Sequence, residues 1–189
     1  MRLFLALELP RDVRDELERL QRGLRRDWQD WRWVRPAGIH LTLRFLGEVG
    51  RATDRDARAG WAASAAGVAP FRLRLGAIGR FPRTGRPRVL WVGAEEPGGD
   101  GRLPELARRL EAQARRSGFP PEQRPFRPHL TLARARRPGR PGWDEAVGAA
   151  ARIEWVAEEL ILFRSELHSS GARYTALDRY PLEEAREEP

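Results

Sequence analysis

The tetrapeptide His-Leu-Thr-Leu occurs twice in this chain, at residues 40–43 and again at residues 129–132. The two copies use two of the only three histidines among 189 residues. One such motif is more often an ordinary polar strand face than a reactive site, and short motifs also match by chance. Because scarce residues recur in the same order in both halves, we interpret the pair as functional. The alternative is a duplicated hairpin whose histidines merely persist.

Side chains on a β-strand alternate between its two faces. Each motif would therefore bring one imidazole and one hydroxyl to a common surface, His40 with Thr42 and His129 with Thr131, while its leucines face the core. Arg44 is expected to continue the polar series of the first motif. The pattern predicts a polar site supported by an apolar layer.

Two imidazoles facing each other suit general acid and general base catalysis near neutral pH, where an unperturbed histidine titrates. At a phosphodiester, a neutral histidine accepts a proton from the attacking water, and a protonated histidine donates one to the departing oxygen. Threonine hydroxyls would donate hydrogen bonds to the phosphate oxygens, and arginines would add charge. This chemistry needs no metal. A zinc site completed by His168 is a weaker alternative, because the motifs lack acidic partners and threonine is a poor zinc ligand.

Composition narrows the classes of function. The chain has no cysteine, which excludes disulfides, thiolate metal ligands and cysteine nucleophiles. All 35 basic residues are arginine and the formal net charge is +8, which favours a phosphate-bearing partner, although a GC-rich genome would also enrich arginine. A lysine-containing phosphate loop and a G-x-S-x-G motif are both absent. No apolar run approaches the roughly 20 residues of a membrane span, so we expect a cytoplasmic protein.

The elements expected to hold the motifs alternate between strands and helices. Apolar runs with two-residue alternation predict strands, and leucine or alanine at helical spacing predicts helices. The expected strands cover 2–9, 31–34, 39–47, 71–81, 86–95, 125–136, part of 154–167, and 172–182, and the expected helices cover 11–26, 54–67, 103–117 and 141–153. Strands outnumber helices and many connections are short, which favours an α+β fold with antiparallel sheets. A strand, a long helix and a motif-bearing strand recur in both halves, as in an internal duplication.

The sequence resembles the two-histidine (2H) phosphoesterase superfamily, whose signature is a pair of His-x-Thr-x motifs. More narrowly, "RWVRPAGIHLTLRFLGEVG", "FPRTGRPRVLWVG", "RPFRPHLTLARAR" and "SELHSSGARYTAL" are similar to the bacterial and archaeal RNA 2′,3′-cyclic phosphodiesterases, also called 2′-5′ RNA ligases (LigT-like). The resemblance implies one bilobal domain over residues 1–182 with pseudo-twofold symmetry. In it, two antiparallel sheets face a central cleft and the helices lie outside. Residues 183–189 would form an acidic C-terminal tail.

The resemblance also implies an activity. Members of this family open 2′,3′-cyclic phosphate ends of RNA to a 2′-phosphate with no cofactor, metal or nucleotide, and they can join ends through a 2′-5′ linkage. The expected partners are RNAs with such ends, tRNA fragments among them, and the expected form is a monomer without membrane association. Two other functions stay open, a catalytically idle RNA-binding module and a phosphodiesterase of small cyclic nucleotides.

The family pattern assigns the motif residues by position. His40 and His129 are the acid and base, and Thr42 and Thr131 hold the phosphate. For a 2′-phosphate product the 3′-oxygen must leave. We expect His40 to be the acid that protonates it and His129 to be the base that activates water.

Further site residues follow from positions near the motifs. The family pattern assigns Phe45 to the terminal base and Arg134 to the phosphate. We add Arg127 as a phosphate ligand, because it lies two residues before His129 on the expected strand. His168 departs from the small or apolar residue expected at its position, and it would alter substrate preference if it lines the cleft.

Overall fold

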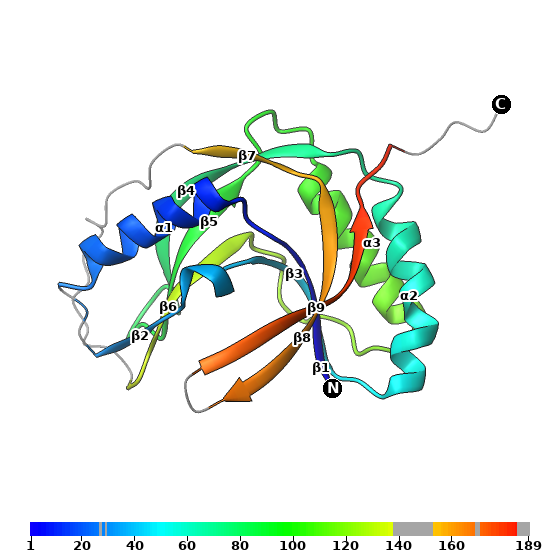
Figure 1. Cartoon of the computed structure of the whole chain (residues 1–189), viewed down its shortest axis with the longest axis horizontal. Helices are drawn as coiled ribbons and strands as arrows, with labels where there is room; N and C mark the ends of the chain where they lie inside the picture. The colour runs from blue at the N-terminus through cyan, green and yellow to red at the C-terminus, as the bar shows by residue number, and fades with distance from the viewer. Residues whose placement is uncertain (27, 29, 138–152, 169–170, 185–189) are drawn as a thin grey trace.

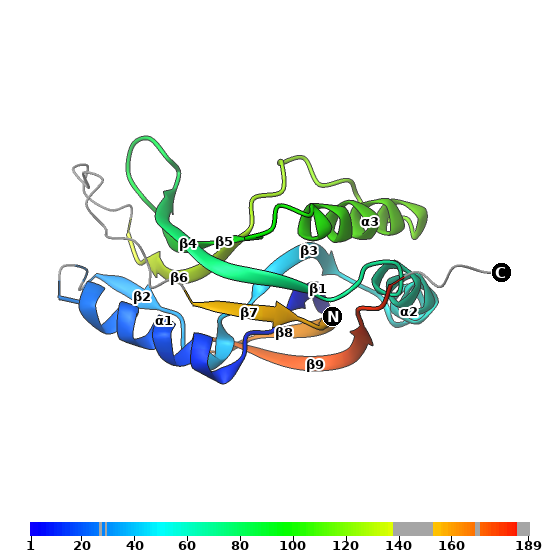
Figure 2. The same ribbon diagram turned by 90° about the horizontal axis from the view of Figure 1, so that it is seen from above.

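The computed structural model shows a strongly curled antiparallel sheet together with α-helices (Figures 1 and 2). It describes residues 1–26, 28, 30–137, 153–168 and 171–184, apart from the side chains of residues 51–56. Three α-helices lie within those ranges. None of these helices has the length and apolar character that crossing a membrane would require.

The elements confirm the expected α+β class. Their bounds are β1 (Arg2–Leu7), α1 (Arg11–Leu24), β2 (Trp31–Trp33), the 3₁₀ helix η1 (Pro36–Gly38), β3 (Leu41–Glu48), α2 (Arg51–Ala65), β4 (Phe71–Phe81), β5 (Val89–Glu95), α3 (Arg102–Arg116), β6 (His129–Ala135), β7 (Glu154–Ala157), β8 (Glu159–His168) and β9 (Gly171–Pro181). The segment 154–167, expected to contain one strand, contributes two. The helix expected at 141–153 falls almost wholly outside the described residues.

The strands form one sheet, so the expectation of two separate sheets is wrong. The order is β7-β4-β5-β6-β3-β1-β8-β9, and β2 also pairs with β6. The halves meet where β3 and β6 pair at a single position, Leu41 opposite Leu130. This one pair keeps the sheet continuous while the two strands diverge on either side of it. Because these leucines are equivalent residues of the two motifs, the halves of the sheet join where the motifs join.

Each half repeats one order of elements around its motif. The sequence β1-α1-β3 in the first half corresponds to β5-α3-β6 in the second, and in both the two strands pair antiparallel. Each helix reaches across to the other half: Gln21 of α1 bonds to the backbone of Leu132 in β6, and Glu111 of α3 pairs with Arg44 of β3. Figure 2 shows α1 beside β2 at one end of the molecule and α3 near β3.

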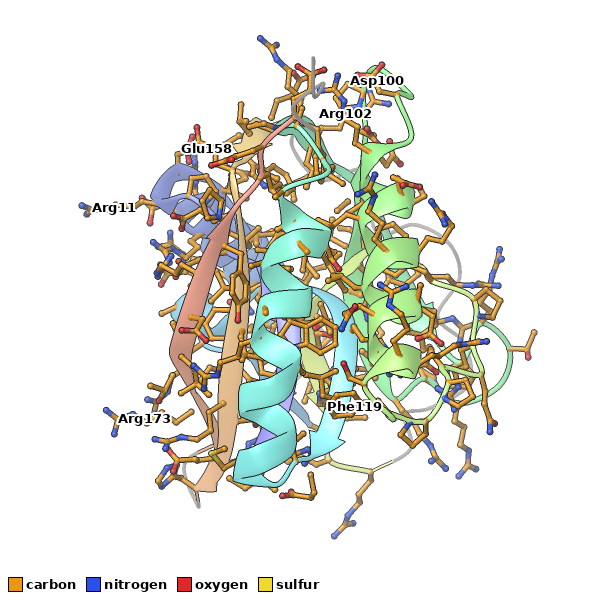
Figure 3. The ribbon with its side chains drawn as sticks, turned by 90° about the vertical axis from the view of Figure 1, so that its right-hand side faces the viewer. Arg11, Asp100, Arg102, Phe119, Glu158 and Arg173 are labelled. Carbon is orange, nitrogen blue, oxygen red and sulfur yellow. The ribbon has the colours of Figure 1, made fainter. Side chains whose placement is uncertain are left out.

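The alternation along β1 divides the interior into two apolar layers. Leu3, Leu5 and Leu7 join the main core, whereas Phe4 and Ala6 face the opposite side of the sheet, in a small cluster with Ile161, Phe163 and Tyr174. Helices α2 and α3 lie side by side (Figure 3). Trp61 of α2 is fully buried, and its ring lies 6.1 Å from that of Phe119 just after α3. Burying one large apolar side chain contributes about 1.5–3 kcal/mol, so this layer fixes the sheet from behind.

A β-bulge ends each motif at the same place. In the pairing of β1 with β3 the register skips Leu43, and in the pairing of β5 with β6 it skips Leu132. A bulge places two residues opposite one and shifts the following side chains to the other face. The two motifs consequently share one burial pattern over six residues, half-buried, buried, half-buried, buried, buried, exposed.

The bulge in β3 overturns the expected position of Arg44. This side chain is only 7% exposed, and it lies on the helix side of the sheet, where its Nε is 2.7 Å from Glu111 Oε2. Its two terminal nitrogens donate to the backbone oxygens of Phe45 and Pro120. Strict alternation would have brought Arg44 to the face of His40, but the extra residue turns it away.

The fully buried Gln21 provides a test of how α1 holds the second motif. Its amide donates to the backbone oxygens of Val34 (2.8 Å) and Leu132 (3.0 Å). Because Gln21→Leu removes both donors from a buried region, we expect the free energy of unfolding to fall by about 1–3 kcal/mol. Urea unfolding followed by tryptophan fluorescence measures the loss. The same change at the exposed Gln123 should cost less than about 0.5 kcal/mol, and equal losses in both variants would contradict the assignment.

Candidate active site

The pairing of β3 with β6 arranges the motif residues as a square. Extending the antiparallel register from the Leu41–Leu130 pair puts His40 on the side of Thr131 and Thr42 on the side of His129. All four side chains are half-buried and leave the sheet on the face opposite to the motif leucines. Because the strands separate from this one pair, the imidazoles flank a space between the two halves that suits one phosphate group.

Both imidazoles are fixed by the same kind of hydrogen bond. His40 Nδ1 lies 2.9 Å from the backbone oxygen of Gly38, and His129 Nδ1 lies 2.7 Å from that of Arg127. A carbonyl oxygen can only accept, so Nδ1 carries a proton in each ring. This leaves Nε2 of each neutral ring with a lone pair, and Nε2 is therefore the atom that can take up or give a proton.

Aromatic rings enclose His40. Phe4 stacks on the imidazole with the ring centroids 4.6 Å apart, and Tyr174 meets it edge-on at 4.9 Å. Burial in these surroundings lowers the pKa of His40 to about 4, and the hydrogen bond to Gly38 offsets only part of that effect. The positive charges of Arg134 and His129 also lower this pKa, which indicates that the three groups lie around one space.

His129 lies in a less enclosed aromatic corner. The edge of Phe81 approaches it at 5.1 Å, and Trp91 lies at 6.2 Å. Gly79 makes room for this indole, because a Cβ at that position would be 2.2 Å from Trp91 Cζ2. Burial lowers the pKa of His129, with an opposing contribution from the hydrogen bond to Arg127 and a further lowering by the charge of Arg134.

The bulges bring one further residue of each motif to the site. Phe45 and Arg134 occupy equivalent positions, two residues after the bulges, and both are exposed. Phe45 is 54% exposed, and its ring lies 5.9 Å from that of Phe4 beside His40. The site thus has an aromatic group on the side of the first motif and a cation on the side of the second.

Arg127 lies outside the strand on which the sequence placed it, and His168 lies at a strand end. Strand β6 begins at His129, so Arg127 precedes the strand rather than lying on its face. Arg127 is exposed, and its backbone oxygen orients His129. His168 ends β8 and is exposed, and no contact between it and either motif histidine occurs among the described residues.

The sequence did not reveal the aromatic walls. Phe4, Phe81, Trp91 and Tyr174 contact the two imidazoles. Alternation in "RLFLAL" does separate Phe4 from the neighbouring leucines, but nothing local shows that the imidazole lies against it. As for the zinc alternative, the described residues contain no group of three or more histidine, cysteine or acidic side chains placed to hold a metal.

Proton titration by NMR tests the enclosure of His40. With three histidines in the chain, the ring resonances can be assigned with His→Gln variants. His40 should titrate at about pH 4, because burial disfavours its charged form. The unfolded chain takes up this proton near pH 6.5, whereas the folded protein takes it up only near pH 4. The free energy of unfolding should therefore decrease as the pH falls from 6.5 towards 4.

Removing one wall should shift this titration. Tyr174→Ala admits water to the edge of the imidazole, so the pKa of His40 should rise towards 6.5 while that of His129 changes little. Leu167→Ala alters a 74% exposed side chain on β8 and serves as the control. A His40 titration that is unaffected by Tyr174→Ala would show that the aromatic enclosure is not the cause of the low value.

Known proteins share this fold and sequence pattern. Residues 7–91 and 95–174 match the family described as LigT like Phosphoesterase. The RNA 2′,3′-cyclic phosphodiesterase of Thermus thermophilus is 38% identical over 186 residues, which cover 96% of this chain and 90% of that protein. The crystal structure of TT0787 of Thermus thermophilus has a TM-score of 0.84 at 36% identity and covers 98% of this chain and 100% of its own. Escherichia coli LigT complexed with 3′-AMP has a TM-score of 0.78 at 30% identity, with coverages of 96% and 97%. The chain is therefore a phosphodiesterase of the LigT-like phosphoesterase family, within the two-histidine superfamily.

Proposed function

We propose that the protein hydrolyses RNA 2′,3′-cyclic phosphate ends to 2′-phosphates by metal-independent acid and base catalysis. The observation that carries this proposal is the square of two imidazoles and two threonines, in which Nδ1 of both rings is tied to backbone and Nε2 is left for proton transfer. The activity for which the Thermus thermophilus relative is named supports the same reaction. In this proposal residues 1–182 form one domain whose two halves act as pseudo-symmetric lobes around the site.

The environments of the histidines favour roles opposite to those expected from sequence. His40 is enclosed by a stacked ring and a ring edge, and its pKa is about 4. It is therefore neutral at physiological pH and serves as the base. His129 has only ring edges beside it, and a bound phosphate anion favours its protonated form. His129 is therefore the acid.

The reaction is one in-line displacement at phosphorus. Nε2 of His40 takes a proton from water as the water oxygen bonds to phosphorus. The bond from phosphorus to the 3′-oxygen breaks, and Nε2 of His129 gives its proton to that oxygen, which leaves the phosphate on the 2′-oxygen. The Thr42 and Thr131 hydroxyls donate to the non-bridging oxygens, and Arg134 adds positive charge as negative charge develops there. Exchange with solvent then returns both rings to their starting states.

In the same proposal, the site also binds the end of the RNA chain and can join two RNA ends. Exposed Phe45 gives the terminal base a surface on which to stack, and Arg127 is a further phosphate ligand from the loop before β6. If a 5′-hydroxyl replaces water as the nucleophile, the same two proton transfers form a 2′-5′ linkage. RNAs ending in a cyclic phosphate, including tRNA fragments, are the proposed substrates, and the active form is a monomer.

An assay on RNA ending in 2′,3′-cyclic phosphate, in the presence of a chelator, tests this function. His40→Ala and His129→Ala should each lower kcat by about 10²–10⁴-fold, because each removes one proton transfer. His168→Ala removes an exposed histidine at the end of β8 and should act like wild type. Binding without turnover in the wild type would indicate the idle module, and turnover of mononucleotides alone would indicate the small-nucleotide enzyme.

A substrate with sulfur in place of the 3′-oxygen separates the two roles. A thiolate leaves without protonation, because its conjugate acid has a pKa of roughly 8.5. His129→Ala should therefore regain most of its lost rate on this substrate, whereas His40→Ala should not. Rescue of His40→Ala instead would return the acid role to His40, and single-turnover rates on the oxygen and sulfur substrates distinguish the outcomes.

A further inference from the structure

Arginines are distributed in two ways over this molecule. On the helices and on strands β4 and β9, many lie within ion-pair distance of carboxylates. Such pairs include Arg14 with Glu8, Arg72 with Glu154, Arg74 with Glu95, Arg108 and Arg109 with Glu105, Arg115 with Glu111, and Arg179 with Glu8 and Glu159. These arginines are largely neutralised by the protein itself.

The hairpin between β4 and β5 differs. Residues 80–88, "RFPRTGRPR", contain four arginines and no acidic residue. Arg83, Arg86 and Arg88 are exposed, and none of them lies within ion-pair distance of a carboxylate in the described part of the chain. Exposed positive charges without counter-charges attract polyanions.

The hairpin holds these arginines on a defined backbone. Arg80 donates to the backbone oxygen of Gly85 at 2.8 Å, and the Arg88 N–H donates to that of Phe81 at 2.7 Å. Gly85 has φ of 77°, a left-handed value that glycine adopts at no steric cost. Pro87 is buried at the base of the loop. A loop tied in this way loses little conformational entropy when it binds a ligand.

The base of the hairpin lies beside His129 of the proposed active site. Phe81, the last residue of β4, lies edge-on to His129 at 5.1 Å. Across the sheet Phe81 is opposite Val89, and Val89 is opposite Arg134, so these side chains share one face. The arginines of the hairpin therefore continue the positive charge of Arg134 away from the site on the side of the second motif.

The opposite rim, formed by β8 and β9, offers no comparable surface in the residues that the structure describes. At the end of β8, Leu167 is 74% exposed, and Glu166 pairs with Arg164 at 3.4 Å. An RNA strand whose cyclic phosphate lies between the histidines continues from the 5′-oxygen of its terminal ribose. It must leave the site over one rim or the other, and within residues 80–88, 159–168 and 171–181 the run of arginines without carboxylates lies on the β4–β5 rim.

We propose that the β4–β5 hairpin binds the single-stranded phosphodiester chain just upstream of the cyclic phosphate. This inference rests on the proposed function of the site and adds where the rest of the RNA lies. Arg83 and Arg86 contact phosphates rather than bases, so the preference is for chain length and not for sequence. Each phosphate contact on a single strand adds about 0.7 to the slope of log affinity against log salt.

Two variants that differ only in where charge is removed test whether the hairpin binds the phosphodiester chain. Arg83→Gln/Arg86→Gln removes two charges from the hairpin, and Arg72→Gln/Arg108→Gln removes two charges from exposed, ion-paired positions elsewhere. For each protein, kcat/KM is measured on an oligonucleotide and on a mononucleotide with the same 2′,3′-cyclic phosphate. The hairpin variant should lower the ratio of the two values about tenfold, and the control should leave it at the wild-type level.

A binding measurement keeps this inference separate from the catalytic proposal. Fluorescence anisotropy with an oligonucleotide ending in 2′-phosphate should show about tenfold weaker binding by the hairpin variant and a smaller salt slope. If the wild type hydrolyses neither substrate, the proposed function fails. The binding measurement then still tests whether the hairpin binds the RNA chain. Equal losses of kcat/KM on both substrates would overturn the inference, because the hairpin would then act only through Phe81 and His129. Equal losses in both variants would also overturn it, because the net charge of the protein, and not the hairpin, would then account for the effect.

Discussion

The site depends on a single backbone contact, the pairing of Leu41 with Leu130 between β3 and β6. An antiparallel pair is symmetric about its centre, so when equivalent leucines of the two motifs meet, the histidine of each motif lies beside the threonine of the other. A slip of one strand by one residue would send its histidine and threonine to the core face. The buried leucines on both sides of that contact make such a slip costly, and the register that stabilises the core is thus the register that assembles the site.

The two bulges convert this symmetry into a usable site. Without them, Arg44 and Ala133 would follow the threonines onto the reactive face, and Phe45 and Arg134 would turn to the core. Each bulge lies where a polar side chain crosses from the opposite half. Gln21 reaches the backbone of Leu132, and Glu111 reaches Arg44, which in turn bonds to the backbone oxygen of Phe45. The exchange of helices between halves therefore locks the backbone where a regular strand would misplace the ligand-binding side chains.

The sequence predicted the three described helices, most of the strands and the motif pair because each has a local signal, namely periodicity, turn residues or repetition. It did not predict that the halves form one sheet, because continuity depends on one long-range pair. It also misplaced Arg44 and Arg127, since a bulge and a strand end are set by partner strands rather than by the residues themselves. The aromatic walls were missed for the same reason. Phe4 and Tyr174 are about 170 residues apart in sequence, and their rings meet at 5.2 Å only in the folded chain.

Duplication explains the geometry of the site, but catalysis requires that the copies differ. Two identical imidazoles in identical surroundings would compete for one proton, and neither would be committed to donate or accept it. Here Phe4 stacks on His40, whereas only the edges of Phe81 and Trp91 approach His129, so burial keeps one ring neutral more firmly than the other. The equivalent residues Phe45 and Arg134 diverge in the same sense, one half becoming apolar and the other cationic. A nucleotide end is itself asymmetric, with a base on one side and a charged chain on the other. Divergence within a symmetric frame therefore produces both the direction of proton transfer and the direction in which the substrate lies.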